Sequence, residues 1–353
     1  MDFDFSEDQQ QLRDAVAKWV EKGYGFERRR EIVASGGFSH EAYTELAELG
    51  LTGLSVPESM GGLGMGPVEA MVVMEELGRG IVIEPLTQAI VAGVLLGHHA
   101  PPQIQQAWGP KVASGEALMV LAHQERKARY RLDVCETQAK AAGSGRVLTG
   151  AKSIVPVGDR ADAWIVPAQL DGQIGLYLVE KGAAGVTTRG YLTQDGGRAA
   201  ELTLSQTPAV CLTENGLAAL EHVVDVGIAC LCAEAVGAME KTLAITVEYM
   251  NTRKQFGVTI ATFQALRHRV ADMKMQLELA RSMSYYASLK LTAPEEERRR
   301  ALARAKYQIG VSMRFVGQQA VQLHGGIGVT DEYIVSHRSE EHTSELQSLR
   351  HLV

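Results

Sequence analysis

Apolar residues recur every three or four positions through the first hundred residues, which is the spacing of one face of an α-helix. This pattern predicts a helical segment from Ser6 to about Pro110. The segment opens at Ser6, where a serine followed three residues later by Gln9 is typical of a capping box. A later helix is expected to end at Gly50, and the glycine-rich and proline-rich stretch from Ser55 to Gly64 indicates a loop between helices.

Between about Glu116 and Pro208 the pattern changes to short apolar runs separated by turn residues. No helical pattern of about 10–15 residues alternates with these runs, so we expect antiparallel pairing in a barrel or sandwich and not a doubly wound sheet. The predicted strands are Leu118–Ala122, Val147–Thr149, Ser153–Val157, Trp164–Val166, Gly175–Val179 and Glu201–Leu204.

After Gly216 the helical spacing returns and continues over long spans. One apolar stripe runs from Leu220 to Met250, and a second runs from Phe263 to Ala287. A third helix is expected to start near Pro294, because three glutamates follow it in a first turn where the helix dipole favours anions. Three long helices of this kind predict a bundle.

The chain is therefore expected to be an α+β protein in three parts. They are an N-terminal helical domain (residues 1–115), a middle β-domain (116–208) and a C-terminal helical bundle (209–337). The segment that begins at Arg338 resembles the in-frame translation of a sequencing-adapter oligonucleotide, so residues 338–353 are interpreted as a non-native tail and the bundle as truncated.

Composition narrows the class of protein. The 353 residues are 46% hydrophobic and 22% charged, as in ordinary soluble domains, and the net charge of −7 gives no excess of cations for nucleic acid. We find neither a secretory leader nor an uninterrupted apolar run of about 18 residues, which predicts a cytoplasmic protein without a membrane span. The four cysteines lack metal-ligand spacing and are expected to be reduced and mostly buried, and no metal site is expected.

Three polar segments at the ends of predicted elements remain as candidate sites. The segment from Tyr249 to Gly257 places Arg253 near Phe256, a pair suited to phosphate and to an aromatic ring, or simply a solvated helix end. The segment from Gln322 to Gly328 has glycines that permit close backbone approach to a ligand or merely end a helix. The third, Val56 to Gly66, is a binding loop or a connecting turn.

In this order and at these separations, the three segments make residues 2–337 resemble the acyl-CoA dehydrogenase family. Four further segments are similar to the small subunits of its two-subunit enzymes, the small subunit of pimeloyl-CoA dehydrogenase above all. These segments are Ala122–Arg126, Arg129–Tyr130, Thr193–Gly196 and Leu231–Gly237.

The resemblance implies an FAD-dependent oxidation of an acyl-CoA thioester to the trans-2-enoyl-CoA. A dicarboxylyl-CoA such as pimeloyl-CoA is a candidate substrate. In the family a carboxylate removes the α-proton while the β-hydrogen leaves as hydride to the flavin. The implied partners are a homologous large subunit and an electron acceptor such as electron-transfer flavoprotein. The residues implied to contact the FAD of a neighbouring subunit are Arg253, Phe256, Gln264, Gln322, Gly325 and Gly326.

On the side of the flavin ring the sequence departs from the family pattern. Pro156 stands where a hydroxyl residue is usual, which removes both the hydroxyl and a backbone donor, and Gln124 is the candidate to replace it near the pyrimidine edge. Arg126, Arg129 and Arg131 add positive charge and are candidates for holding CoA phosphates or the far carboxylate of a dicarboxylate; an exposed basic turn is the alternative. The candidate substrate-binding residues of this turn are Arg126, Arg129 and Tyr130.

The catalytic base has no standard candidate. Most members carry it downstream of the glycine segment, beyond His337, and a minority use a glutamate at a position that corresponds to Gly227 here. Asp225 is the nearest carboxylate, although two residues of offset turn it to a different side of the helix. Asp225 is the candidate base within the chain; otherwise the partner subunit supplies the base, or this chain is catalytically silent at its own site. The alternatives are a non-catalytic structural paralogue and a flavoprotein similar to an acyl-CoA oxidase.

Overall fold

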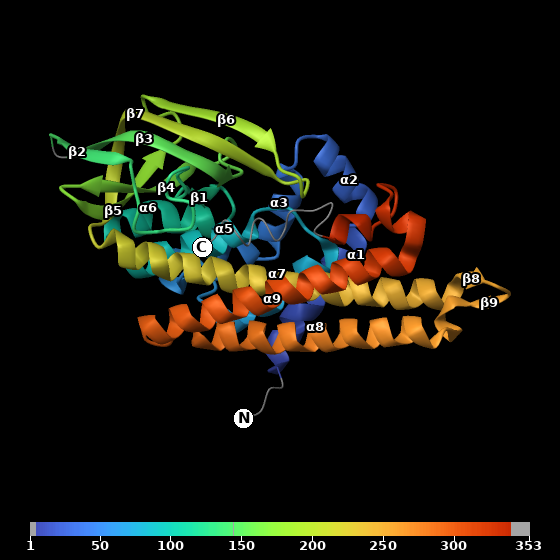
Figure 1. The fold of residues 1–353 in the computed structure, drawn as a ribbon. Helices are drawn as coiled ribbons and strands as arrows, with labels where there is room; N and C mark the ends of the chain where they lie inside the picture. The colour runs from blue at the N-terminus through green and yellow to red at the C-terminus, as the bar shows by residue number, and fades with distance from the viewer. Residues whose placement is uncertain (1–4, 144, 340–353) are drawn as a thin grey trace. The chain divides into compact units, whose positions relative to one another are not determined.

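The computed structural model describes residues 5–143 and 145–339, which form two compact units (Figure 1). The described parts of the first unit are residues 5–31, 67–82 and 228–339, and those of the second are 32–66, 83–143 and 145–227. The predicted architecture, with helices before and after a β-region, is confirmed. The domain boundaries and the adapter origin of the tail stay predictions. Residues 340–353 of that tail lie outside the described residues, whereas Arg338 and Ser339 are buried.

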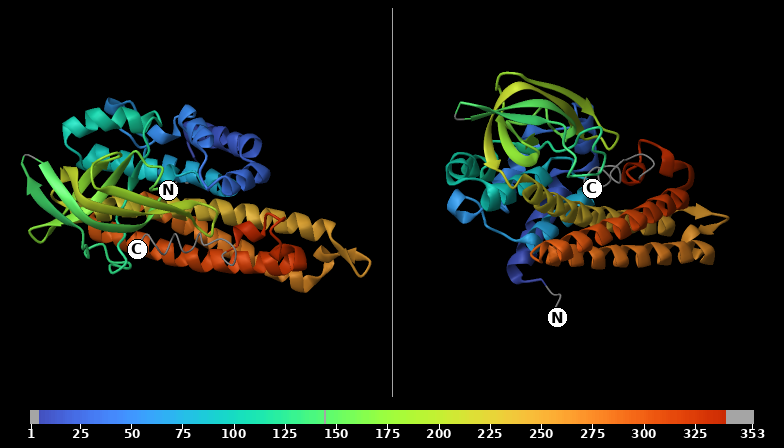
Figure 2. Two further views of the ribbon diagram at one scale, coloured as in Figure 1. Left: turned by 90° about the horizontal axis from the view of Figure 1, so that it is seen from above. Right: turned by 60° about the vertical axis from the view of Figure 1, so that its left-hand side comes forward.

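The first unit is helical. Figures 1 and 2 show its part of α7 running beside α8 and α9, the bundle of three long helices that the sequence predicts. Its elements are α1 (Glu7–Gly23), most of α2 (Phe26–Ala34), α4 (Pro67–Gly80), the larger part of α7 (Gly216–Thr252), β8 (Lys254–Gln255), β9 (Val258–Thr259), η3 (Ile260–Thr262), α8 (Gln264–Lys290), α9 (Glu295–His324), η4 (Gly325–Val329) and η5 (Ser336–Arg338).

The helix starts and stops expected from local sequence are confirmed. The Ser6 hydroxyl accepts a hydrogen bond from the backbone N–H of Gln9 at 3.2 Å, and the Gln9 side chain accepts one from the Ser6 N–H at 3.0 Å. Pro294 precedes α9 and three glutamates occupy its first turn. Gly50 follows the end of α3 with φ of 78°, a left-handed conformation that glycine adopts without strain.

Helices α4 and α7 approach each other through glycines. A Cβ atom added to Gly78 would lie 2.0 Å from the carbonyl oxygen of Glu234, and one added to Gly237 would lie 1.8 Å from that of Glu75. Both distances are far below any van der Waals contact. Only glycine therefore permits this crossing, which brings the polar side chains of the two helices together.

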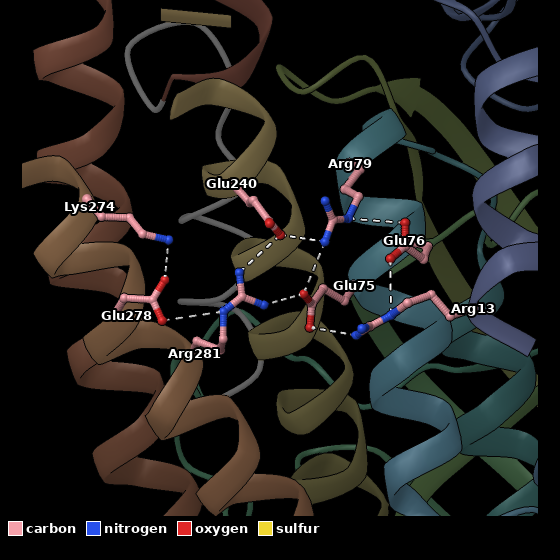
Figure 3. A network of polar contacts seen from close by, with 8 residues as sticks. All are labelled: Arg13, Glu75, Glu76, Arg79, Glu240, Lys274, Glu278 and Arg281. Atoms are coloured by element: carbon pink, nitrogen blue, oxygen red, sulfur yellow. Dashed lines mark hydrogen bonds and ion pairs between the residues drawn. The ribbon is translucent and has the colours of Figure 1, made fainter. Parts of the chain in front are cut away.

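An eight-residue charge network crosses the first unit at this level (Figure 3). Arg281 contacts Glu75 at 2.5 Å and Glu240 at 3.0 Å, and Arg79 contacts Glu240 at 2.5 Å. Since Glu75 is almost fully buried, the arginines that contact it offset the free-energy cost of placing its carboxylate in the interior. The network connects α1, α4, α7 and α8, and its members are Arg13, Glu75, Glu76, Arg79, Glu240, Lys274, Glu278 and Arg281.

The second unit contains a β-barrel and short helices. Its helical elements are the end of α2, α3 (His40–Glu48), η1 (Leu51–Gly53), η2 (Glu58–Met60), α5 (Leu86–His99), α6 (Pro102–Ala113) and the start of α7. Its strands are β1 (Met119–Leu121), β2 (Gln138–Ala142), β3 (Gly145–Pro156), β4 (Ala163–Leu170), β5 (Gln173–Glu180), β6 (Val186–Leu192) and β7 (Arg198–Thr213).

The strand pairings close a ring, in the order β4, β2, β3, β7, β5 and back to β4. The predicted barrel is confirmed, and most of its pairs are antiparallel, whereas β1 and β2 pair with β4 in parallel. The runs predicted at 147–149 and 153–157 belong to one strand, β3, and the runs that form β2 and β6 were not predicted. The barrel core contains Trp164, whose indole N–H donates to the Gly158 carbonyl at 2.9 Å.

Helix α7 is long and apolar enough to cross a membrane by length and composition, but 72% of its most apolar window is buried inside the protein. Such burial is typical of a core helix. All four cysteines are free thiols, and three of them are buried, as expected. Among the described residues no group of three or more His, Cys, Asp or Glu side chains is placed to hold a metal ion.

Candidate functional site

The first candidate segment forms a hairpin after α7. Strands β8 and β9 are joined by Phe256 and Gly257, whose φ angles of 55° and 81° give both central residues the left-handed conformation of a tight hairpin turn. Phenylalanine rarely adopts this conformation, and its side chain here is 91% exposed. Phe256 therefore combines backbone strain with solvent exposure, a combination found at binding sites more often than at purely structural positions.

Arg253 lies at the base of this hairpin. Its backbone N–H donates to the Tyr249 carbonyl at 2.8 Å, and its own carbonyl accepts from the Ile260 N–H at 2.9 Å, so the backbone is held on both sides. The side chain is exposed and forms no ion pair with any residue that the structure describes. Its guanidinium is thus available for an anionic ligand. Gln264, the first residue of α8, is also exposed, close behind the hairpin in the chain.

The second candidate segment follows the last turn of α9. Gly325 has φ of 63°, and a Cβ atom added to Gly325 or to Gly326 would meet no atom within 4 Å. No packing constraint excludes a side chain at Gly326, so an open backbone surface is the feature these glycines provide. Gln322, one turn earlier, is exposed.

These two segments lie at the same end of the bundle in one chain. The ring of Tyr249 stacks on that of His324 with centroids 4.4 Å apart, and the Tyr249 hydroxyl donates to the His324 carbonyl at 3.3 Å. Tyr249 stands four residues before Arg253, and His324 directly precedes Gly325. The Tyr249–His324 contact therefore brings the segment with Arg253 and Phe256 close to the segment with Gly325 and Gly326, as a binding surface shared by both segments requires.

The remaining predicted residues belong to the second unit. Gln124 is half-buried, and its backbone carbonyl accepts a hydrogen bond from the Ser153 N–H at 2.9 Å. Arg126, Arg129 and Tyr130 are exposed on the turn that follows. Asp225 is only 3% exposed, so it faces the packed side of α7. The ligand contacts of all these residues stay predictions.

The third candidate segment, Val56–Gly66, supports the connecting-turn interpretation. A Cβ atom added to Gly62 would lie 2.1 Å from the Val56 carbonyl oxygen, and the Gly64 N–H donates to the same carbonyl at 2.8 Å. Gly62 is thus needed for the internal packing of this segment.

Sequence reasoning missed a buried ion pair inside the barrel. Lys152 Nζ contacts Glu125 Oε1 at 2.6 Å, with side-chain exposures of 0% and 3%. Burial raises the pKa of Glu125, but the charge and hydrogen bond of Lys152, together with Thr137 and the Glu136 N–H, outweigh it and lower the pKa to about 2. Only Lys152 carried a signal, as a single charge shortly before the apolar run from Ile154 to Val157, whereas Glu125 stands among polar and basic residues.

Two family models match the helical parts of the chain before and after the β-barrel. The family model described as "Acyl-CoA dehydrogenase, N-terminal domain" matches residues 6–116, and that described as "Acyl-CoA dehydrogenase, C-terminal domain" matches residues 214–344. The chain is 30% identical to acyl-CoA dehydrogenase IpdE2 of Mycobacterium tuberculosis over 330 residues, which cover 93% of this chain and 88% of that protein.

Two further similarities concern assemblies. A chain of the ChsE4–ChsE5 complex from Mycobacterium tuberculosis has 27% identity and a TM-score of 0.88, with coverage of 100% of this chain and 96% of that one. The caffeyl-CoA reductase–Etf complex subunit CarC of Acetobacterium woodii is 26% identical over 354 residues, which cover 94% of this chain and 91% of that subunit.

The chain belongs to the acyl-CoA dehydrogenase family. It is accordingly a flavin-dependent oxidoreductase that acts on CH–CH bonds of acyl-CoA thioesters, and its cofactor is FAD. When bound, FAD accepts the hydride of the dehydrogenation. The described residues fit this cofactor. The exposed Arg253 guanidinium and Phe256 ring belong to one segment and the open glycine backbone to the other, and the Tyr249–His324 stack joins the two segments at one end of the bundle.

Proposed function

We propose that the chain is the small subunit of a heteromeric acyl-CoA dehydrogenase that oxidises a dicarboxylyl-CoA, such as pimeloyl-CoA, to its trans-2-enoyl thioester. The electrons then pass to an acceptor such as electron-transfer flavoprotein. The single observation that supports a dicarboxylate is the state of Arg129, the one arginine of the loop 125–133 that has no ion pair among the described residues.

The other cations of this loop have partners. Lys127 contacts Glu136 at 2.7 Å, Arg131 contacts Asp133 at 2.5 Å, and Arg126 lies 3.6 Å from Glu201. Arg129 instead combines an exposed side chain with φ of 52°, a left-handed conformation that is uncommon for arginine. An exposed guanidinium that has no ion pair among the described residues is suited to bidentate binding of a carboxylate or phosphate group, and backbone strain such as that at Arg129 is common at binding sites.

For FAD we propose two sets of contacts. Arg253, Phe256, Gln264, Gln322, Gly325 and Gly326 contact the FAD of a neighbouring subunit, with the guanidinium and the glycine amides toward its diphosphate. Gln124 of each small subunit lies toward the pyrimidine edge of the flavin. The Tyr249–His324 stack supports the first set, since it keeps both segments on one surface.

The heteromer is supported by the state of the candidate base. Asp225 is buried on α7, and the alternative family position is Gly227, which has no side chain. A base must come within hydrogen-bond distance of the proton that it removes. We therefore assign the base to the homologous large subunit. The similarity to a chain of the ChsE4–ChsE5 complex supports an assembly of two different chains.

The test compares two thioesters of equal carbon number, pimeloyl-CoA and heptanoyl-CoA, by anaerobic bleaching of the flavin in the co-purified heteromer. We expect half-maximal bleaching at a roughly tenfold lower concentration of pimeloyl-CoA than of heptanoyl-CoA, because one charge-assisted contact is worth about 1.5 kcal/mol. Arg129→Met should remove this preference, whereas Lys127→Met, which alters a neighbouring cation, should retain it.

Other outcomes contradict specific parts of the proposal. If Arg129→Met weakens both thioesters equally, Arg129 binds CoA phosphates and the dicarboxylate assignment is wrong. Gly227 also favours a second candidate, a non-catalytic structural paralogue. Colourless protein in the presence of the large subunit would establish that candidate, and peroxide formation on bleaching would indicate an oxidase.

A further inference from the structure

Five hydrogen-bond donors converge on the buried carboxylate of Glu125. Lys152 Nζ lies 2.6 Å from Oε1, and Thr137 contributes its hydroxyl at 2.7 Å and its backbone N–H at 3.1 Å. The Glu136 N–H donates to Oε2 at 2.5 Å, and the Cys135 thiol lies 3.5 Å from Oε1. One carboxylate therefore connects three segments of the barrel: the turn after β1, the start of β2 and the middle of β3.

Directly after Lys152 the backbone of β3 leaves its regular path. The register with β7 shifts between Lys152 and Val155, and Ile154 has φ of 51°. A β-branched residue in this conformation is a true outlier, and such strain persists only where the surrounding structure fixes it. Within the bulge, the Ser153 N–H donates to the Gln124 carbonyl at 2.9 Å.

The bulge and the turn are thus held at two adjacent points. Glu125 and Lys152 are joined by their side chains, and their chain neighbours Gln124 and Ser153 are joined by their backbones. Packing adds a third restraint, because a Cβ atom added to Gly150 would lie 2.5 Å from the Thr137 hydroxyl oxygen. Loss of the ion pair would release the first restraint and leave one buried charge without its partner.

We propose that Glu125 and Lys152 are positioning residues, whose ion pair holds the Ser153–Ile154 bulge and, through the backbone hydrogen bond from Ser153 to Gln124, keeps Gln124 in place for the flavin ring. This inference rests on the proposed function in one respect, the placement of Gln124 toward the pyrimidine edge. The ion pair itself contacts neither cofactor nor substrate; it acts through the backbone of its neighbours.

The test uses Lys152→Met in the full chain with its partner subunit, and Lys181→Met as the matched control. Lys181 forms an exposed ion pair with Asp162 in the same barrel, so its loss removes a similar charge without touching the bulge. The measurements are hydrogen exchange of the Ser153 amide, FAD affinity, and the absorption spectrum and reduction potential of the bound flavin.

For Lys152→Met we expect exchange of the Ser153 amide to accelerate about tenfold, the FAD dissociation constant to rise about tenfold, and the flavin spectrum and potential to shift. Lys181→Met should match the wild type in all four. Lys152→Arg should recover most of the FAD affinity because it keeps the positive charge toward Glu125.

A double variant, Glu125→Leu with Lys152→Met, separates positioning from folding. Replacing a buried ion pair by apolar residues often preserves stability. We expect the double variant to fold while its spectrum and potential stay shifted. A double variant with a wild-type spectrum, potential and exchange rate would overturn the inference. Wild-type protein that binds no FAD would instead refute the proposed function, and the exchange of Ser153, measured without flavin, would still test the restraint.

Discussion

Tyr249 and His324 lie face to face at the end of the bundle, with ring centroids 4.4 Å apart and an interplanar angle of 29°. The Nδ1 atom of His324 lies 2.8 Å from the Ala320 carbonyl oxygen, so Nδ1 carries the proton and donates. His324 is 3% exposed. The contact that joins the two predicted FAD-binding segments therefore depends on a buried imidazole.

This burial predicts a pH dependence of stability. Burial lowers the pKa of His324 below 6.5, although its hydrogen bond to Ala320 acts in the opposite direction. The unfolded chain therefore takes up the proton first as the pH falls below about 6.5, and folded-state stability decreases from there, with a limiting slope of about 1.4 kcal/mol per pH unit. His324→Asn should remove this component in urea unfolding at pH 5 and 7.5. His268→Asn, at an exposed histidine of α8, is the control, and an equal effect of both would contradict the assignment.

The turn residue Phe256 should show opposite effects on stability and on cofactor binding. Phe256→Gly replaces a residue that is strained in the left-handed conformation by one that adopts it freely. Because the Phe256 ring is largely exposed, its removal costs little buried apolar surface, and we expect the free energy of unfolding to rise by about 1 kcal/mol. The same change removes the exposed ring and should weaken FAD binding. Thermal unfolding and FAD titration measure the two effects. The control is Tyr307→Ala, at a 74% exposed aromatic residue of α9, which should change neither the stability nor the FAD affinity. Unaltered FAD affinity in Phe256→Gly would mean that the Phe256 ring is not part of the site.

Two glycines in the same unit should respond differently to one added methyl group. Gly326→Ala meets no atom within 4 Å and should leave stability within about 0.5 kcal/mol of the wild type, while FAD binding weakens because backbone approach is blocked. Gly237→Ala places Cβ 1.8 Å from the Glu75 carbonyl oxygen and should destabilise by at least about 3 kcal/mol. Chemical unfolding and FAD titration distinguish them. Wild-type FAD affinity in Gly326→Ala would mean that the glycine only ends the helix.

Features with a local cause were predictable from the sequence. The capping box at Ser6 and the start of α9 after Pro294 each depend on residues within one turn. The two apolar stripes predicted α7 and α8 from the helical spacing of residues that lie close together in the chain. Strand β2 was missed because its sequence, Gln138–Ala142, buries only Ala139 and lacks β-branched residues, so no alternating pattern marks it.

Features that depend on distant partners were not predictable. Glu125 and Lys152 are 27 residues apart, and the left-handed conformation of Ile154 occurs where the register of β3 with β7 shifts. For the candidate site, residue types at helix ends suggested Arg253 and Gly325, but the stack that joins them unites residues 75 positions apart. Which residues approach across such separations is decided by packing, which a single sequence does not specify.

The charge network supplies the last prediction, because Arg281 is a main partner of the buried Glu75. Arg281→Met breaks the contacts at 2.5 Å to Glu75 and 3.0 Å to Glu240, and Glu75 remains in the interior with less compensation. Loss of one member of a buried ion pair typically costs about 3–5 kcal/mol. Since Arg79 and Arg13 still approach Glu75 at 3.5 Å and 3.8 Å, we expect the lower end of that range.

The matched control for Arg281→Met is Arg300→Met, which removes an exposed pair with Glu296 on α9 and should cost no more than about 1 kcal/mol. Urea unfolding at neutral pH measures both variants. Adding Glu75→Gln to Arg281→Met should recover part of the loss, because the amide places no charge in the interior. Equal losses of stability in Arg281→Met and Arg300→Met, or no recovery in the double variant, would contradict this prediction. Either result would mean that the remaining arginines are enough to compensate the buried carboxylate of Glu75.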